Sequence, residues 1–165
     1  RDKKRAVAIM REVEASTSIY LGTVALINIC EGAVVAGVLW ALHMPNAPLW
    51  GVLAAMLEFV PYVGAATMVA VLTLAGLTTF PTTGQALLIP GSFLAINLLQ
   101  ANLVSPIVLG KRLTLNPVAI FISLMVFWEL WGVAGAFVAV PLIATVKIFC
   151  DHIESLAPLG EFLGK

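Results

Sequence analysis

Charged side chains are almost absent from a long central stretch, residues 15–110, of this 165-residue sequence. Between Ala15 and Gly110 only Glu31 and Glu58 carry a charge. The surface of a soluble domain cannot be built from such a stretch, because about a quarter of the residues in soluble domains are charged. The whole sequence agrees, with 61% hydrophobic residues, 11% charged residues and a mean hydropathy of +1.03. The apolar runs are continuous rather than alternating, so they predict an all-α, polytopic integral membrane protein.

The apolar segments and the turns between them predict the domain organisation. Residues 1–18 are amphipathic and predict a lead-in helix on the cytoplasmic side. Residues 151–165 are polar and predict a cytoplasmic tail. Residues 19–150 then form a transmembrane transport domain. We expect this domain to contain a span at 19–42, a hairpin at 47–79, a span at 85–104 and a hairpin at 117–149.

The first hairpin is predicted to be broken. Its first arm, Trp50–Val60, has 11 residues, and at 1.5 Å per residue this gives about 16 Å of helix. A membrane core of about 30 Å is too thick for such an arm to cross. Pro61 then removes a helix hydrogen bond and Gly64 permits a turn. We therefore interpret 47–79 as a re-entrant hairpin with Glu58 beside its tip; full crossing by each arm is the alternative.

The second hairpin resembles the first. A shift of 71 residues places Glu58 on Glu129 and Gly64 on Gly135. Basic residues favour the cytoplasmic side, so the N-terminal cluster and the Lys111–Arg112 pair should both lie there. The two hairpins then enter the membrane from opposite faces, and both ends of this segment are cytoplasmic. Inverted repeats with broken helices are typical of secondary transporters, whose substrate site lies near the membrane midplane.

Polar side chains within the apolar segments are the candidate binding residues. Such groups are costly at membrane depth and usually face a polar cavity or a partner, although amides also join helices. The candidate substrate- or ion-binding residues are Glu31, Glu58, Asn97, Gln100, Asn102, Ser105 and Glu129. The candidate break or hinge residues are Pro61, Gly64, Pro106, Gly110, Gly132 and Gly135.

Several short motifs follow one another between residues 45 and 145. They are Phe59-x-Pro61-Tyr62-x-Gly64, Gln100-x-Asn102-x-x-x-Pro106-x-x-x-Gly110, Leu115-x-Pro117, and Gly132-x-x-Gly135 with Val140–Pro141. In the order and spacing of these motifs, the sequence resembles the autoinducer-2 exporter family of bacterial membrane proteins.

The resemblance implies a multi-pass protein of the bacterial cytoplasmic (inner) membrane, of which this chain would be the C-terminal half. It also implies export of the quorum-sensing signal autoinducer-2 in some members and sodium/proton antiport in others. Homo-oligomers, and pentamers in particular, are expected for the family. One position departs from the pattern, because Glu58 stands where an amide is expected in many members. This departure favours a member that is coupled to protons or another cation.

The sequence therefore favours a membrane transporter or exporter of a small polar organic molecule, with Glu58 and Glu129 as proton or substrate carriers. A sodium/proton antiporter is the first alternative, and a non-transporting membrane scaffold is the second. We expect no enzyme, because the sequence lacks H-E-x-x-H, G-x-S-x-G and a phosphate-binding glycine loop. We also expect no cofactor, metal or nucleic-acid partner. The expected partners are the lipid bilayer and the substrate, Na⁺ or H⁺.

Overall fold

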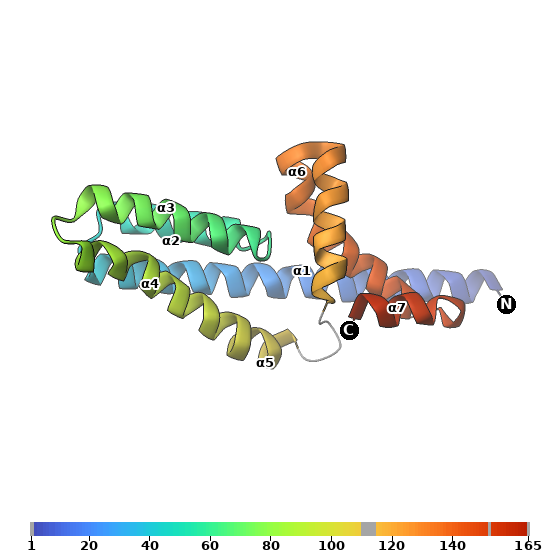
Figure 1. Ribbon diagram of the computed structural model, residues 1–165. Helices are drawn as coiled ribbons and strands as arrows, with labels where there is room; N and C mark the ends of the chain where they lie inside the picture. The colour runs from blue at the N-terminus through green and yellow to red at the C-terminus, as the bar shows by residue number, and fades with distance from the viewer. Residues whose placement is uncertain (1, 110–114, 152, 165) are drawn as a thin grey trace. The chain divides into compact units, whose positions relative to one another are not determined.

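The computed structural model describes residues 2–109, 115–151 and 153–164, and every regular element within these ranges is a helix (Figure 1). The expected all-α class is confirmed. Three helical segments are long and apolar enough to cross a membrane, namely Glu14–Ala41, Thr83–Val108 and Pro117–Asp151. The chain forms two compact units. We call Val24–Val108 the central unit, and Arg1–Thr23 together with Leu109–Lys165 the terminal unit.

Helix α1, Asp2–Ala41, is continuous over 40 residues. The sequence suggested a lead-in helix over 1–18 and a separate span over 19–42, but the structure joins them without a break. The physical reason is local, because no proline occurs before Pro45 and no glycine occurs before Gly22. Nothing therefore interrupts the backbone hydrogen bonds where the polar segment meets the apolar one.

Two short helices form the hairpin of the central unit, α2 at Ala47–Leu57 and α3 at Val63–Thr79. They lie side by side in Figure 1. Asn46 precedes α2 with a φ of 57°, a left-handed conformation that asparagine tolerates well. The indole N–H of Trp50 donates a 3.0 Å hydrogen bond to the carbonyl of Pro45, which fixes the start of α2 against the preceding turn.

The tip of this hairpin is a tight turn. Tyr62 has a φ of 62°, an unusual backbone conformation for a residue with a bulky side chain. The amide N–H of Gly64 donates a 2.7 Å hydrogen bond to the carbonyl of Val60. A Cβ atom on Gly64 would lie 1.9 Å from the carbonyl oxygen of Leu57. Only glycine therefore allows the two arms to approach this closely.

The last span of the central unit is built from three consecutive pieces. Helix α4, Thr83–Leu99, continues into the π-helix η1, Gln100–Val104, and then into α5, Ser105–Leu109. Proline has no N–H to donate, so Pro106 interrupts the regular pattern of backbone bonds in this segment. The wider turn of a π-helix, in which the N–H of Ser105 reaches the carbonyl of Gln100, accommodates this interruption.

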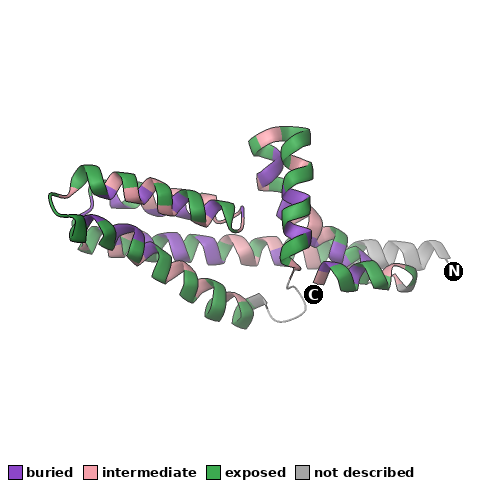
Figure 2. Cartoon of the chain, in the orientation of Figure 1, coloured by how far each residue is buried: buried purple, intermediate pink, exposed green. Residues whose placement is uncertain are grey.

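The apolar core of the central unit joins α1, α2, α3 and α4. Figure 2 shows buried residues along the facing sides of these helices. The cluster comprises Val35, Leu39, Met44, Ala47, Ala54, Met68, Leu72, Ile89 and Phe93. Helices α1 and α2 cross at two glycines, since a Cβ on Gly32 would lie 2.4 Å from the carbonyl oxygen of Gly51. Small residues at such a crossing let the backbones pack directly, as is common in membranes.

The terminal unit contains the second hairpin, within α6, Pro117–Asp151. Its helical path is interrupted at Gly132, where φ is 61° and ψ is −139°. Three residues later, a Cβ on Gly135 would lie 1.8 Å from the carbonyl oxygen of Phe127. The break thus combines a positive φ with a glycine packed on the opposite arm, as in the first hairpin.

The segment 151–165, expected to be a polar tail, contains ordered helix in its described part. It forms the 3-10 helix η3, Glu154–Leu156, and helix α7, Ala157–Gly164, which packs on α6. Leu163 is buried, and its carbonyl accepts a 2.8 Å hydrogen bond from the amide of Asn116. The apolar residues of α7 and the hydrogen bond from Asn116 therefore hold this segment on its own unit.

Candidate substrate and ion site

On three helices of the central unit, a stripe of buried residues ends in a polar side chain. On α1, Asn28 and Glu31 continue the stripe of Val35 and Leu39 at helical spacing. On α2, Ala47, Gly51 and Ala54 are buried and Glu58 follows four residues later. On α4, Asn97 likewise follows the buried Phe93. The same three faces that form the apolar core therefore also bring polar groups together beside it.

Glu31 is the centre of this polar cluster, which we define as Asn28, Glu31, Glu58 and Asn97. The amide Nδ2 of Asn97 donates a 3.1 Å hydrogen bond to Oε1 of Glu31. Glu58 ends the buried stripe of α2 within electrostatic range of Glu31, and its Oε1 is buried without a hydrogen-bond partner among the described residues. Residues that are 66 positions apart in the sequence, Glu31 and Asn97, thus meet in one site.

Several polar atoms of the cluster are buried without a partner among the described residues. They are Oε2 of Glu31, Oε1 of Glu58 and Nδ2 of Asn28. The exposed fractions of Asn28 and Glu31 are only 3% and 4%, so their polar groups are well shielded within the protein. A buried donor or acceptor without a partner costs about 1–3 kcal/mol. The cluster can therefore offer two carboxyl oxygens and one amide donor to a ligand.

The cluster has no neutralising cation within its own unit. The sequence contains no lysine or arginine between Ala15 and Gly110. Each isolated buried ion costs several kcal/mol, and two buried carboxylates side by side also repel each other. The Glu31–Glu58 pair is therefore more stable with a bound proton or cation than with both carboxyl groups ionised and unneutralised.

Helix α2 separates the cluster from the start of the first hairpin by about half the thickness of a membrane core. The 11 residues of α2 give about 16 Å of helix, which is about half of a 30 Å hydrocarbon core. Glu58 follows the last residue of α2, and Glu31 lies ten residues before the end of α1. Ionisable groups within apolar segments long enough to cross a membrane usually belong to a substrate or ion pathway.

The other polar residues of the last span have a different environment. Asn102 is exposed, and its Nδ2 donates a 2.7 Å hydrogen bond to the carbonyl of Leu98 in the preceding turn. Gln100 and Ser105 are half-buried, at the start of η1 and of α5. The structure therefore brings Asn97 to the cluster, whereas Asn102 satisfies its own helix backbone. A π-helix that carries polar residues is often a functional feature of a helix.

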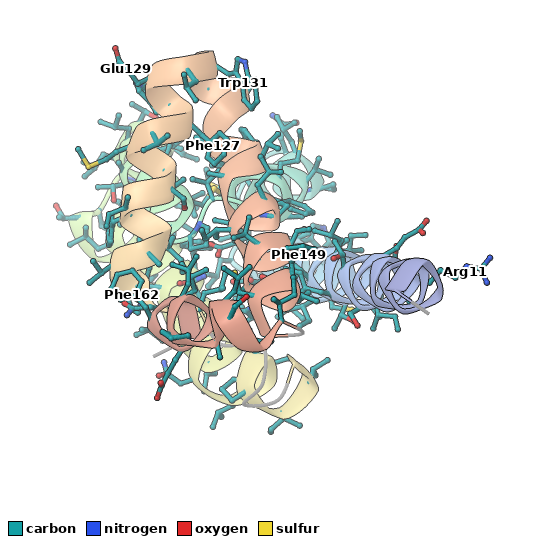
Figure 3. The ribbon with its side chains drawn as sticks, turned by 90° about the vertical axis from the view of Figure 1, so that its right-hand side faces the viewer. Arg11, Phe127, Glu129, Trp131, Phe149 and Phe162 are labelled. Carbon is teal, nitrogen blue, oxygen red and sulfur yellow. The ribbon has the colours of Figure 1, made fainter. Side chains whose placement is uncertain are left out.

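Glu129 lies in the terminal unit, at the tip of the α6 hairpin (Figure 3). Its side chain is exposed and points away from the hairpin, as does that of the neighbouring Trp131. Among the described residues of the terminal unit, no hydrogen bond to the carboxyl group of Glu129 is present.

The proposed break residues occupy different positions. Pro61 and Gly64 lie at the tip of the first hairpin, and Gly132 and Gly135 lie at the tip of the second. Pro106 follows the π-helix in α5. Gly110 lies outside the described residues.

Asn28 is the cluster residue that the predicted site did not include. The sequence could have indicated that Asn28 lies beside Glu31, because residues three positions apart on a helix share a face and Asn28 precedes Glu31 by three. The buried environment that makes this spacing meaningful is visible only in the structure.

A separate groove of about 450 Å³ lies between α1 and α2. It is lined by the neighbouring face of α1, including Ile29 and Ala36, and by Pro48, Val52 and Phe59 of the first hairpin. These side chains are apolar, so the groove lacks the hydrogen-bonding groups of the cluster. It suits hydrocarbon rather than a polar solute.

Comparison with known proteins gives consistent matches over almost the whole chain. A family model described as "AI-2E family transporter" matches residues 1–155. "AI-2 transport protein TqsA" of Escherichia coli K12 is 35% identical over 161 residues, covering 96% of this chain and 46% of that protein. "Putative transport protein YhhT" of the same strain is 27% identical over 158 residues, covering 96% and 45%. The chain thus spans about half the length of the relatives it matches. Both relatives are named as transport proteins and not as enzymes.

Proposed function

This chain belongs to the AI-2E family of transporters, as its motifs led us to expect, and we propose that it carries a small polar organic molecule across a membrane with proton or cation coupling. The observation that supports this most is the buried polar cluster of Asn28, Glu31, Glu58 and Asn97. It offers unpartnered polar atoms about halfway along the segments that cross the membrane.

Coupling is proposed to reside in the two carboxyl groups. Glu31 accepts a hydrogen bond from Asn97, Glu58 lies within electrostatic range of Glu31, and no basic residue of the central unit neutralises them. A carboxyl pair that must bind a cation or a proton can exchange it when the site opens to one side of the membrane. Movement of the solute and of the cation would then depend on the same side chains.

The proposed solute is a hydroxylated molecule related to autoinducer-2, and the proposed direction is export. One relative is named as an AI-2 transport protein, and hydroxyl groups can both donate to carboxylates and accept from amides. Glu129, Gln100, Asn102 and Ser105 are proposed to contribute further solute contacts during transport. We also propose an inner-membrane location, cytoplasmic ends for this segment, and assembly into homo-oligomers such as pentamers.

The test uses the full-length protein in proteoliposomes that contain a pH-sensitive dye. Autoinducer-2 is added outside, and in a separate experiment a sodium gradient is imposed. A dye response that requires autoinducer-2 supports proton-coupled transport of the organic solute. Transport of labelled autoinducer-2 without any dye response refutes proton coupling through the carboxyl pair.

Sodium/proton antiport is the second candidate. The observation that favours it is the combination of two carboxyl groups with amide groups in one buried cluster, because such oxygen atoms also ligate small hard cations. A dye response to the sodium gradient alone, without organic solute, would favour this function over export.

A further inference from the structure

Two polar side chains on one face of α1 are buried, and each has a hydrogen-bonding atom that is not used. Asn28 and Glu31 are almost completely buried, with exposed fractions of 3% and 4%. Nδ2 of Asn28 and Oε2 of Glu31 have no hydrogen-bond partner among the described residues. Residues three positions apart on a helix have Cβ atoms about 5–6 Å apart. An amide donor and a carboxyl acceptor are therefore neighbours on α1, within a segment that is long enough to cross a membrane.

The hydrogen bond from α4 determines which oxygen of Glu31 is free. Nδ2 of Asn97 donates a 3.1 Å hydrogen bond to Oε1 of Glu31 and leaves Oε2 as the remaining acceptor. Asn97 is half-buried and follows the fully buried Phe93 by four residues, so the packing of Phe93 fixes the helix face that carries Asn97. Asn97 therefore acts as a positioning residue, because it holds the carboxyl group of Glu31 from the side of α4.

A donor beside an acceptor matches the chemistry of a hydroxyl group. A hydroxyl can donate to a carboxyl oxygen and accept from an amide N–H at the same time. A metal cation is matched less well, because it requires oxygen ligands and the free atom of Asn28 is a nitrogen that carries hydrogens. A solute without a hydroxyl group would leave both atoms unpaired, so the two side chains also select against such a solute.

We propose that Asn28 and Glu31 recognise the transported solute by binding one of its hydroxyl groups between Nδ2 of Asn28 and Oε2 of Glu31. Asn97 keeps Glu31 in the orientation that this contact requires. The inference rests on the proposed function, because it names the part of the polar cluster that contacts the solute. It assigns solute recognition to one face of α1.

A binding role for Asn28 and a structural role predict opposite effects on stability. The buried residues farther along this face of α1, Val35 and Leu39, are apolar. A buried donor without a partner destabilises the folded protein, and an apolar side chain of similar shape removes this cost. If Asn28 instead supported the fold, removal of its amide would destabilise the protein. The sign of the change in melting temperature therefore separates the two roles.

The experiment measures thermal unfolding of the full-length protein in detergent and choline chloride buffer, with and without autoinducer-2. Asn28→Leu removes the amide with little change in shape, and Asn28→Ala is a second variant that needs no space for a branched side chain. Glu31→Gln places an N–H donor where the carboxyl group offers only acceptors. Thr73→Val is the matched control, because Thr73 on α3 is part-buried and its hydroxyl already donates a 2.7 Å hydrogen bond to the carbonyl of Val69.

Without solute, we expect Asn28→Leu to raise the melting temperature by about 2–4 °C, whereas Thr73→Val should not raise it. Autoinducer-2 should raise the melting temperature of the unmodified protein and of Thr73→Val, because a ligand that binds only the folded state stabilises that state. This solute-induced rise should be lost in Asn28→Leu, Asn28→Ala and Glu31→Gln. Asn28→Leu would then be a more stable protein that no longer binds its solute.

Other results would overturn the inference. A lower melting temperature of Asn28→Leu without solute would make Asn28 a structural residue. A full response to autoinducer-2 in both Asn28 variants would show that the solute binds elsewhere, and the proposed function would stand without this pair. If sodium chloride in place of choline chloride stabilised the unmodified protein but not Asn28→Leu, the pair would bind a cation rather than a hydroxyl group. If the unmodified protein did not respond to autoinducer-2 at all, the proposed solute would fail together with the pair.

Discussion

Both hairpins break at a glycine that packs on a backbone carbonyl, but the residues around the two breaks differ. In the first, Gly64 packs on the carbonyl of Leu57, and in the second Gly135 packs on the carbonyl of Phe127. Each break also contains a residue with φ near 60°. The acids differ, because Glu58 is half-buried within electrostatic range of Glu31 whereas Glu129 is exposed. The repeat in the sequence thus accounts for the breaks, and the flanking spans decide what each acid contacts.

The aromatic residues extend this contrast. Phe127 and Trp131 stack near the second break, with ring centroids 5.7 Å apart. Residues four apart on a helix can stabilise its end in this way without any polar neighbour. The second break thus has a local aromatic contact on its own helix, while the first hairpin packs on α4 through α3.

The largest expected effect tests the close glycine packing that the two hairpins share. Gly64→Ala and Gly135→Ala each place a Cβ within 2 Å of a carbonyl oxygen, and we expect each to lower the free energy of unfolding by about 3 kcal/mol. Thermal unfolding of the full-length protein in detergent measures this. Gly37→Ala, where a Cβ meets nothing within 4 Å, is the control. Equal stability of all three variants would contradict the close packing of the hairpin arms.

The second prediction separates the cluster from the other amides. Asn97→Ala leaves the buried Glu31 without its hydrogen bond, and we expect a loss of about 2 kcal/mol of stability. Asn102→Ala removes only a contact to the helix backbone on an exposed face, so its cost should stay below about 1 kcal/mol. The same unfolding measurement compares them. A larger loss for Asn102→Ala would show that Asn97 does not support the site.

The third prediction compares the two acids in transport. We expect Glu58→Gln to lower proton-coupled uptake or release about tenfold, which corresponds to about 1.4 kcal/mol. Glu129→Gln should change it less than about threefold, or about 0.7 kcal/mol, because its carboxyl is exposed. The dye assay in proteoliposomes measures both variants. Similar losses of transport for the two variants would mean that Glu58 and Glu129 have equivalent roles. The exposure of Glu129 would then be a poor guide to its function.

The pH dependence of the same variants sharpens this comparison. A transporter that uses an exchangeable proton on Glu58 should lose its response to pH when glutamine replaces that acid, since glutamine does not titrate. The variant should therefore give one rate across the range in which the unmodified protein varies. A profile for Glu58→Gln that still follows the unmodified protein would exclude Glu58 as the proton carrier.

Helical class, family and hairpin breaks could be predicted from the sequence because they depend on local features. Long uncharged runs require helices in a membrane, and Pro61 and Gly64 mark a turn wherever the chain packs. The hydrogen bond between Glu31 and Asn97 could not be predicted, because the two residues come from different helices and no local pattern links them. The helix at Ala157–Gly164 was missed for a similar reason, since its stability comes from packing on α6 rather than from its short sequence.

The smallest expected effect concerns the turn residue of the second break. Gly132 has φ 61° and ψ −139° and open space around it, so a side chain there meets backbone strain but no clash. Gly132→Ala should cost about 1 kcal/mol, well below the effect of Gly135→Ala three residues away. Thermal unfolding of the two variants tests this order. If Gly132→Ala were the more damaging, conformation rather than close packing would set the second break. The two hairpins would then hold their shape by different means, despite their matching sequences.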